Sequence, residues 1–235
     1  MQMRKKYLFG IFVALCLVFY LRFVIVDLFE LLAGPGWSEE SDSFLPWWMV
    51  NWIVLYLPAW FLGLWDCESS LNRAHMCIHR FRNIRTWWFR VFGRMIAYVA
   101  VIYLMMSILL FFVRKDIPAI QMLLCMILIA IHALFSLAFA IWIRLLSGSM
   151  ILAAIFTLVL EAIAKVFVVT GILQPAYSIF SWGMYHYSSN VYGKGGFVIG
   201  AAVIIQFIII ISPCFCVFGK GKEILLRRIN DGKVH

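Results

Sequence analysis

Charged residues are scarce in this sequence. Only 13% of its 235 residues are Asp, Glu, Lys or Arg, and 65% are hydrophobic, whereas an ordinary soluble domain has about 25% charged and roughly 45–50% apolar residues. This composition excludes a soluble globular protein. The length fits about six membrane crossings and leaves no stretch for a second, soluble domain, so we predict one membrane domain over residues 1–235.

Nucleotide-binding and catalytic motifs are also missing. No G-x-x-x-x-G-K-[ST] occurs, and the glycine-rich stretches at 193–196 and 219–222 lack its spacing and the Ser or Thr that would ligate magnesium. There is no G-x-S-x-G, and no in-membrane set of paired acids with histidines. We therefore expect that this chain binds no cofactor and is not an enzyme. An intramembrane enzyme is the least supported alternative.

The cysteine and histidine patterns exclude two further possibilities. None of the six cysteines falls in a predicted outer loop, so no disulfide is expected. His75 and His79 stand four residues apart, with Cys77 between them and Cys67 upstream. H-x-x-x-H without a Glu after the first His lacks the base of a metalloprotease, and no convincing zinc set is present. We expect no metal site here, and we place these histidines at the lipid headgroups or in a partner interface.

Long apolar runs dominate what is present. Each run is long enough for a transmembrane helix, and none alternates polar and apolar residues as a membrane barrel would. The first run opens after three basic residues but continues past Val26, so we interpret it as a retained helix and not as a signal peptide. The prediction is an all-α protein with six transmembrane helices, at about 8–32, 45–65, 95–113, 120–143, 150–169 and 197–218.

The distribution of Lys and Arg predicts the orientation. With the amino terminus inside, fifteen of these residues fall in inner segments and only Arg114, Lys115 and Lys194 fall outside. Because cytoplasmic loops carry the excess of Lys and Arg, both termini are expected in the cytoplasm. The net charge of +9 therefore reports topology and does not indicate nucleic-acid binding. Tryptophans near the predicted inner span ends are expected to anchor at the interface: Trp60, Trp65, Trp87 and Trp88.

The inner segment 66–94 is too long for a turn and predicts a short surface helix. Its arginines could bind anionic lipid headgroups, each contributing about 1 kcal/mol. Alternatively, the apolar residues between them could make the segment a docking element for a cytoplasmic subunit. The residues that would carry this coupling are Arg80, Phe81, Arg82, Arg85, Trp87 and Trp88.

A family resemblance favours the docking alternative. The string I-H-R-F-R-N-I-R-T-W-W-F-R-V-F-G-R at 78–94 resembles the loop between the second and third helices of bacterial ABC transporter permeases of the small peptide-export and lantibiotic-immunity type. The outer sequence S-W-G-M-Y at 181–185 and the basic tail at 222–228 are similar to the corresponding parts of these permeases. The sequence departs from the family pattern in carrying Cys67, His75, Cys77 and His79.

The resemblance implies an exporter-type fold in which two six-helix subunits pair, each the same or a related chain. It also implies that the loop between spans two and three docks on a separate cytoplasmic ABC ATPase, which binds ATP and magnesium. The expected location is the bacterial plasma membrane. The expected partners are thus the ATPase, a second permease subunit, membrane lipid and a peptide or similar amphipathic substrate.

Two charged residues lie inside the fifth span. Glu161 and Lys165 stand at i and i+4, in the order that favours a helical ion pair. A charge at the bilayer centre costs at least about 2.5–3.5 kcal/mol, so both side chains should face the protein interior or a wet cavity. They either neutralise each other and fix helix packing, or form part of a substrate path or a conformational latch.

Polar residues of the fourth span form a weaker stripe, and we interpret Gln121, His132 and Ser136 as packing residues that bond neighbouring helices. The outer loop 170–196 is rich in Tyr, Trp, Ser and Gly. It suits a cap over an outer vestibule, although an interface belt would have the same composition. The predicted vestibule residues are Trp182, Met184, Tyr185 and Tyr187.

These patterns predict the permease subunit of an ATP-driven exporter for a hydrophobic or antimicrobial peptide or similar amphipathic compound. An ATP-independent carrier or channel that uses Glu161, Lys165 and His132 as an ion relay is the alternative.

Overall fold

The computed structural model describes residues 12, 16, 46–74, 83–113, 118–218, 222–224, 226, 227 and 229. Most of these residues are helical. None of them belongs to a strand, and they form one isolated bridge, between Ser188 and Phe197. The all-α prediction is confirmed for this part of the chain. Of the first predicted span only Phe12 and Cys16 are described, and both are helical. The long helices are α3 (Pro46–Asn72), α5 (Ile84–Val113), α6 (Ala119–Ser147), α7 (Met150–Val169) and α9 (Ile199–Ile211), which continues as a 3₁₀ segment over Ser212–Val217.

Three of the described helices are long and apolar enough to cross a membrane. They are Ile84–Phe112 of α5, α6 and α7, and a shorter apolar helix covers Ile199–Phe215. Large apolar side chains such as Phe112, Ile151 and Ile204 are more than 60% exposed on these helices. Monomeric soluble proteins rarely expose apolar surface on this scale. The fold is therefore compatible with a multi-pass membrane protein.

The helices α3 and α5 extend beyond the predicted spans. The prediction of a separate surface helix at 66–94 is wrong for the described residues, because α3 continues to Asn72 and α5 begins at Ile84. Asn83 caps α5, since its side-chain oxygen accepts hydrogen bonds from the Thr86 amide and hydroxyl at 2.8 and 2.9 Å. The acidic residues that end the apolar run of α3 do not end the helix, because arginines of neighbouring helices pair with them, as described below.

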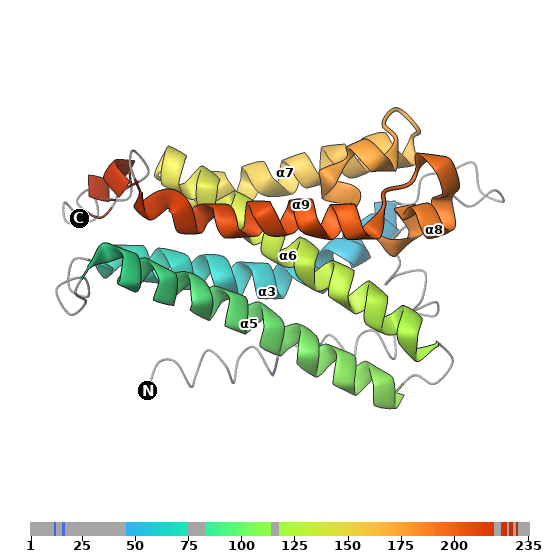
Figure 1. The fold of residues 1–235 in the computed structure, drawn as a ribbon, viewed down its shortest axis with the longest axis horizontal. Coiled ribbons are helices and arrows are strands. Elements are labelled where there is room, and N and C mark those ends of the chain that lie inside the picture. Colours follow the sequence, from blue (N-terminus) through green and yellow to red (C-terminus); the bar gives the residue numbers. More distant parts are fainter. Residues whose placement is uncertain are drawn as a thin grey trace.

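Helix α6 is the centre of the bundle. In Figure 1 it crosses between the α3 and α5 helices on one side and the α7 and α9 helices on the other. It packs against all four, and it is the most buried of the three membrane-length helices. Gly63 of α3 allows close approach, because a Cβ at this position would lie 2.4 Å from Leu137 of α6. The bundle interior is therefore organised around α6.

A connection of two residues fixes the relative positions of α6 and α7. Gly148 ends α6 in a left-handed conformation (φ 79°), and its amide bonds the Arg144 carbonyl. Ser149 then caps α7 by accepting a hydrogen bond from the Leu152 amide at 3.3 Å. The two helices thus form an antiparallel hairpin. The short connection fixes which residues of α6 lie beside which residues of α7.

Candidate functional site

Six side chains from three helices meet in the bundle interior. Each helix contributes two residues spaced by four, so each pair lies on one helical face. All six side chains are 1% exposed or less. We call this group the Glu161 cluster: Trp52 and Tyr56 of α3, His132 and Ser136 of α6, and Glu161 and Lys165 of α7.

The Glu161 carboxylate is the centre of the cluster. Its Oε2 accepts hydrogen bonds from the Tyr56 hydroxyl and from Lys165 Nζ, the latter at 2.7 Å. Its Oε1 accepts a hydrogen bond from the Ser136 hydroxyl and lies 3.1 Å from His132 Nε2. Buried carboxylates are stable only when paired and hydrogen-bonded. Here three donors and the His132 ring, from three helices, meet this requirement.

Lys165 makes its second set of contacts with aromatic rings. Its Nζ lies 3.9 Å from the centroid of a Trp52 ring and 5.1 Å from that of Tyr56. A cation over an aromatic face gains about 2 kcal/mol or more where water is excluded. The Trp52, Tyr56 and His132 rings also pack against one another at centroid distances of 5.1–5.4 Å. The aromatic residues therefore surround the ion pair.

Glu161 and Lys165 lie in the protein interior as an ion pair. The structure assigns His132 and Ser136 a more specific part than packing, because both contact the Glu161 carboxylate. Gln121 lies in the first turn of α6, outside the cluster. Sequence reasoning missed Trp52 and Tyr56. Their i, i+4 spacing in the second span can be seen in the sequence, but nothing in the sequence relates it to the acid of the fifth span.

The segment between α7 and α9, which we call the outer segment after its predicted location, packs against the cluster at His132. It runs through the short helical turns Pro175–Tyr177, Ile179–Ser181, Tyr185–Tyr187, Ser189–Tyr192 and Gly193–Gly195, and Figure 1 shows it folding back beside α7 and α9. Gly183 lies against His132, because a Cβ there would be 2.6 Å from the His132 Cβ and Cγ. Phe180 packs on Phe135 and Phe139 of α6 at 5.3 and 5.6 Å. Residues 178–188 of this segment are therefore part of the bundle interior.

The predicted vestibule residues lie within this segment. Trp182, Met184 and Tyr187 are buried, and Tyr185 is partly buried. The Trp182 indole donates a hydrogen bond to the Pro175 carbonyl at 3.0 Å. A hollow of about 230 Å³ nearby is lined by Tyr187, but its other lining residues are Val168, Val169, Thr170, Gly171 and Tyr192. The predicted vestibule residues are therefore packed within the segment and, apart from Tyr187, do not line this hollow.

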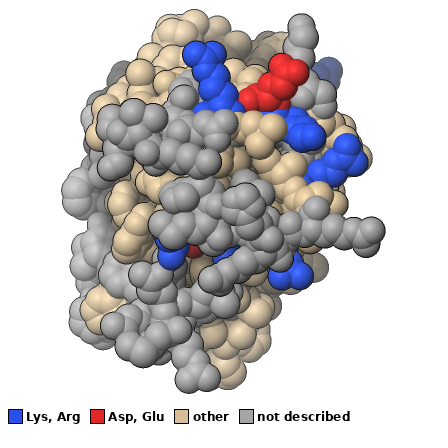
Figure 2. Space-filling view, turned by 90° about the vertical axis from the view of Figure 1, so that its left-hand side faces the viewer, with Lys and Arg blue, Asp and Glu red and all other residues tan. Residues whose placement is uncertain are grey.

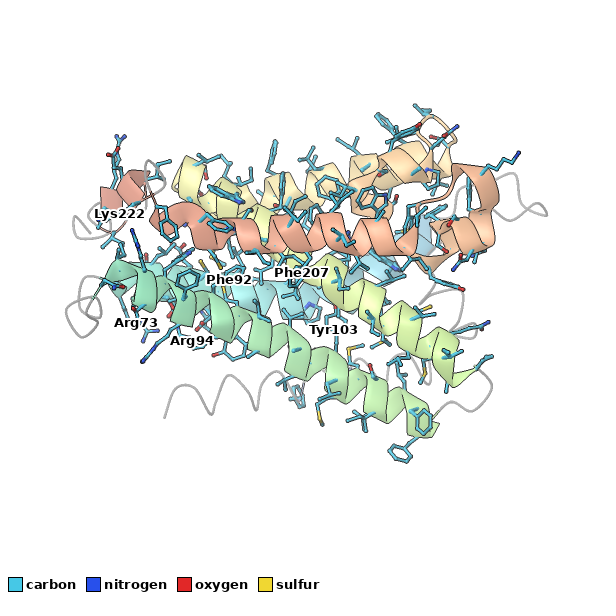
Figure 3. The ribbon with its side chains drawn as sticks, in the orientation of Figure 1. Arg73, Phe92, Arg94, Tyr103, Phe207 and Lys222 are labelled. Carbon is cyan, nitrogen blue, oxygen red and sulfur yellow. The ribbon has the colours of Figure 1, made fainter. Side chains whose placement is uncertain are left out.

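Ion pairs join α3 to its neighbours at the other end of the bundle. Arg144 of α6 binds Glu68 through two hydrogen bonds, at 2.5 and 3.0 Å. Arg94 of α5 lies 3.3 Å from Asp66 and donates a hydrogen bond to Ser70 at 2.8 Å. Figure 3 shows Arg94 at this end, together with Arg73 and Lys222. These bonds connect α3, α5 and α6 at the end of the bundle that lies away from the Glu161 cluster.

The predicted coupling residues divide into three groups. Arg80, Phe81 and Arg82 lie outside the described residues. Trp87 and Trp88 are buried, and the Trp88 indole donates a hydrogen bond to the Pro213 carbonyl at 2.8 Å. Arg85 is exposed, with its guanidinium 4.3 Å from the Phe218 ring centroid. The two tryptophans therefore anchor the start of α5 inside the bundle. Trp60 of α3 is buried as well. Of these four expected interface anchors, only Trp65 is exposed, at 47%.

The described residues include no group of three or more His, Cys, Asp or Glu side chains placed to hold a metal ion. Cys67 is buried in α3, whereas His75, Cys77 and His79 lie outside the described residues. The fold and the cluster together define an all-helical protein with membrane-length apolar helices and a buried charged centre. No protein-family model, curated protein or solved structure matches the chain.

Proposed function

We propose that this chain is the permease subunit of an ATP-driven transporter in the bacterial plasma membrane. It would have six transmembrane helices and both termini in the cytoplasm, and it would pair with a second permease subunit. A separate ABC ATPase would bind ATP and magnesium. The cargo would be a hydrophobic or antimicrobial peptide or a similar amphipathic compound. The family resemblance of the 78–94 string supports this proposal, and one structural observation carries it further.

That observation is a basic surface at one end of the molecule, which we call the basic end: Arg73, Arg85, Arg90, Arg94, Lys222 and Arg227. Figure 2 views the molecule from this side and shows Lys and Arg side chains spread over it. The surface joins residues far apart in the sequence, because Arg85 stacks on Phe218 next to the carboxyl-terminal segment. A basic surface built from two segments suits an acidic partner surface.

Charge reversal at the basic end tests this docking role. We expect Arg85→Glu with Arg90→Glu to reduce the ATPase recovered with the permease from native membranes by at least about tenfold, since breaking a buried interfacial charge pair costs about 2–5 kcal/mol. Quantitative mass spectrometry of the purified complex measures the ratio of the two chains.

Lys194→Glu is the matched control, because Lys194 is exposed in the outer segment at the opposite end. It should leave the ATPase ratio unchanged. Equal ATPase recovery with both charge reversals would mean that the basic end contacts only lipid. Absence of any ATPase from the wild-type preparation would contradict the permease proposal itself.

An ATP-independent carrier or channel is the second candidate, and the Glu161 cluster favours it. The cluster connects titratable and hydroxyl groups of α3, α6 and α7 through one carboxylate. We expect liposomes that contain the purified chain alone to show no proton flux above that of empty liposomes, because the cluster is closed to solvent. A pH-sensitive dye inside the liposomes measures this flux. A flux abolished by Glu161→Gln together with Lys165→Met would support the carrier instead.

A further inference from the structure

The ammonium group of Lys165 lies in a chemically complete cation site. The Glu161 carboxylate is 2.7 Å away, a Trp52 ring faces it at 3.9 Å and the Tyr56 ring lies at 5.1 Å. Aromatic faces with an adjacent carboxylate are the usual protein environment for an organic ammonium ion. Two of these three groups come from α3, so the site is not a local feature of α7 alone.

Most of this site is held in place without Lys165. The Glu161 carboxylate also accepts hydrogen bonds from Tyr56 and Ser136 and contacts His132, and these residues belong to other helices. Trp52 is fixed by ring contacts with Tyr56 and His132. Removing the Lys165 side chain should therefore leave a carboxylate and two ring faces in nearly the same positions.

The electrostatic requirement of the site is one positive charge. Tyr56 and Ser136 are neutral donors, and His132 in its neutral form likewise orients the carboxylate without compensating its charge. A fully buried carboxylate needs a cation beside it. Of small cations, one with an alkyl chain and an ammonium head matches both the apolar ring faces and the carboxylate.

We propose that Trp52, Tyr56 and Glu161 form a binding site for a primary alkylammonium group, and that Lys165 is its covalently attached occupant. A transported compound with a free amine would compete with Lys165 for this site. The cargo part rests on the proposed transport function, whereas the binding site does not. In this structure Gly183 of the outer segment packs against His132 of the cluster and so helps to keep other ligands out.

Chemical rescue tests the site directly. Lys165→Ala removes the atoms beyond Cβ, which are matched atom for atom by n-propylammonium. We expect about 100 mM n-propylammonium chloride to raise the thermal midpoint of the purified full-length Lys165→Ala chain in detergent by roughly 3 °C or more. Potassium chloride at equal ionic strength and neutral 1-propanol should give no such rise, and the wild type should respond to none of the three.

Two further variants keep the test decisive. Lys165→Ala with Glu161→Gln removes the charge requirement and should fold without responding to the amine. Lys165→Ala with Trp52→Leu keeps the carboxylate but loses the ring face, so its response should be smaller. If Lys165→Ala folds only when the amine is present, that is rescue. If Lys165→Ala folds neither with nor without the amine while the Glu161→Gln double variant folds, the proposal is overturned. An equal rise of the thermal midpoint in all variants would also overturn it.

A lipid with an ethanolamine headgroup carries the same ammonium chemistry as an amine-bearing cargo. Nanodiscs of phosphatidylcholine, with or without phosphatidylethanolamine, separate these sources for Lys165→Ala. We expect stabilisation by an amphipathic peptide with a free amine, none by its acetylated form, and no effect of phosphatidylethanolamine. Stabilisation by the lipid alone would overturn the cargo part. These measurements use the chain without an ATPase, so their failure is distinct from loss of the ATPase partner.

Discussion

Replacing either Glu161 or Lys165 alone should destabilise the protein strongly. Each single change, Glu161→Gln or Lys165→Met, leaves one charge buried without its partner, and such losses cost about 3–5 kcal/mol. Both side chains are 1% exposed or less, so solvent cannot compensate. Thermal unfolding in detergent, followed by loss of monodisperse protein, measures the effect. The double variant Glu161→Gln with Lys165→Met should recover most of the stability, because it removes both charges together.

On the proposed permease function, transport by the double variant distinguishes a packing pair from a functional one. If the pair only fixes the helices, the stable double variant should transport at the wild-type rate in vesicles that contain the ATPase. The position of the pair beneath the outer segment leads us to expect recovered assembly with impaired transport. Full transport by a stable double variant would contradict a functional part. Single variants as stable as the wild type would show that the two groups do not pair in the folded protein.

The sequence predicted the long helices of the described residues, the Glu161–Lys165 pair and the polar residues His132 and Ser136, but not the aromatic residues around the pair. Apolar runs identify membrane-length helices reliably because backbone amides in the bilayer must be satisfied within the helix. A charge in such a run must likewise have a partner. The i, i+4 spacing of Glu161 and Lys165 indicated that these two residues pair with each other. Trp52 and Tyr56 gave no such signal, because aromatic residues on an apolar helix also occur wherever a core is packed.

Helix ends were harder to predict for a related reason. Asp66 and Glu68 end the apolar run of the second span, so the sequence alone places the end of the helix near them. Their partners, Arg94 and Arg144, lie on other helices. Pairing with residues of other helices thus allows α3 to continue past its acidic residues to Asn72. No pattern within the sequence of α3 indicates this pairing.

The contact between the outer segment and α6 depends on one missing side chain. Gly183 has no Cβ, and the backbone there approaches His132 so closely that an added Cβ would lie 2.6 Å from two of its atoms. Sequence reasoning assigned this segment to a cap over an outer vestibule, because its aromatic and small polar residues suit an amphipathic ligand. The glycine adds that close packing against α6 is required at this point.

Gly183→Ala should therefore displace the outer segment from the Glu161 cluster. Its Cβ meets the His132 Cβ and Cγ, which belong to the base of a buried side chain and cannot move away freely. Overpacking of this kind costs about 1–3 kcal/mol, and here it also presses His132 against the carboxylate it contacts. We expect a lower thermal midpoint, together with faster hydrogen exchange of the 175–187 amides than in the wild type.

Gly200→Ala provides the matched control, because Gly200 lies in α9 with nothing within 4 Å of an added Cβ. Alanine favours a helix by about 1 kcal/mol over glycine, so this variant should be as stable as the wild type or more stable. The comparison separates a general effect of an added methyl group from a clash at His132. If Gly183→Ala and Gly200→Ala show the same stability and the same exchange at 175–187, the outer segment does not close on His132, and the Glu161 cluster must be covered in some other way.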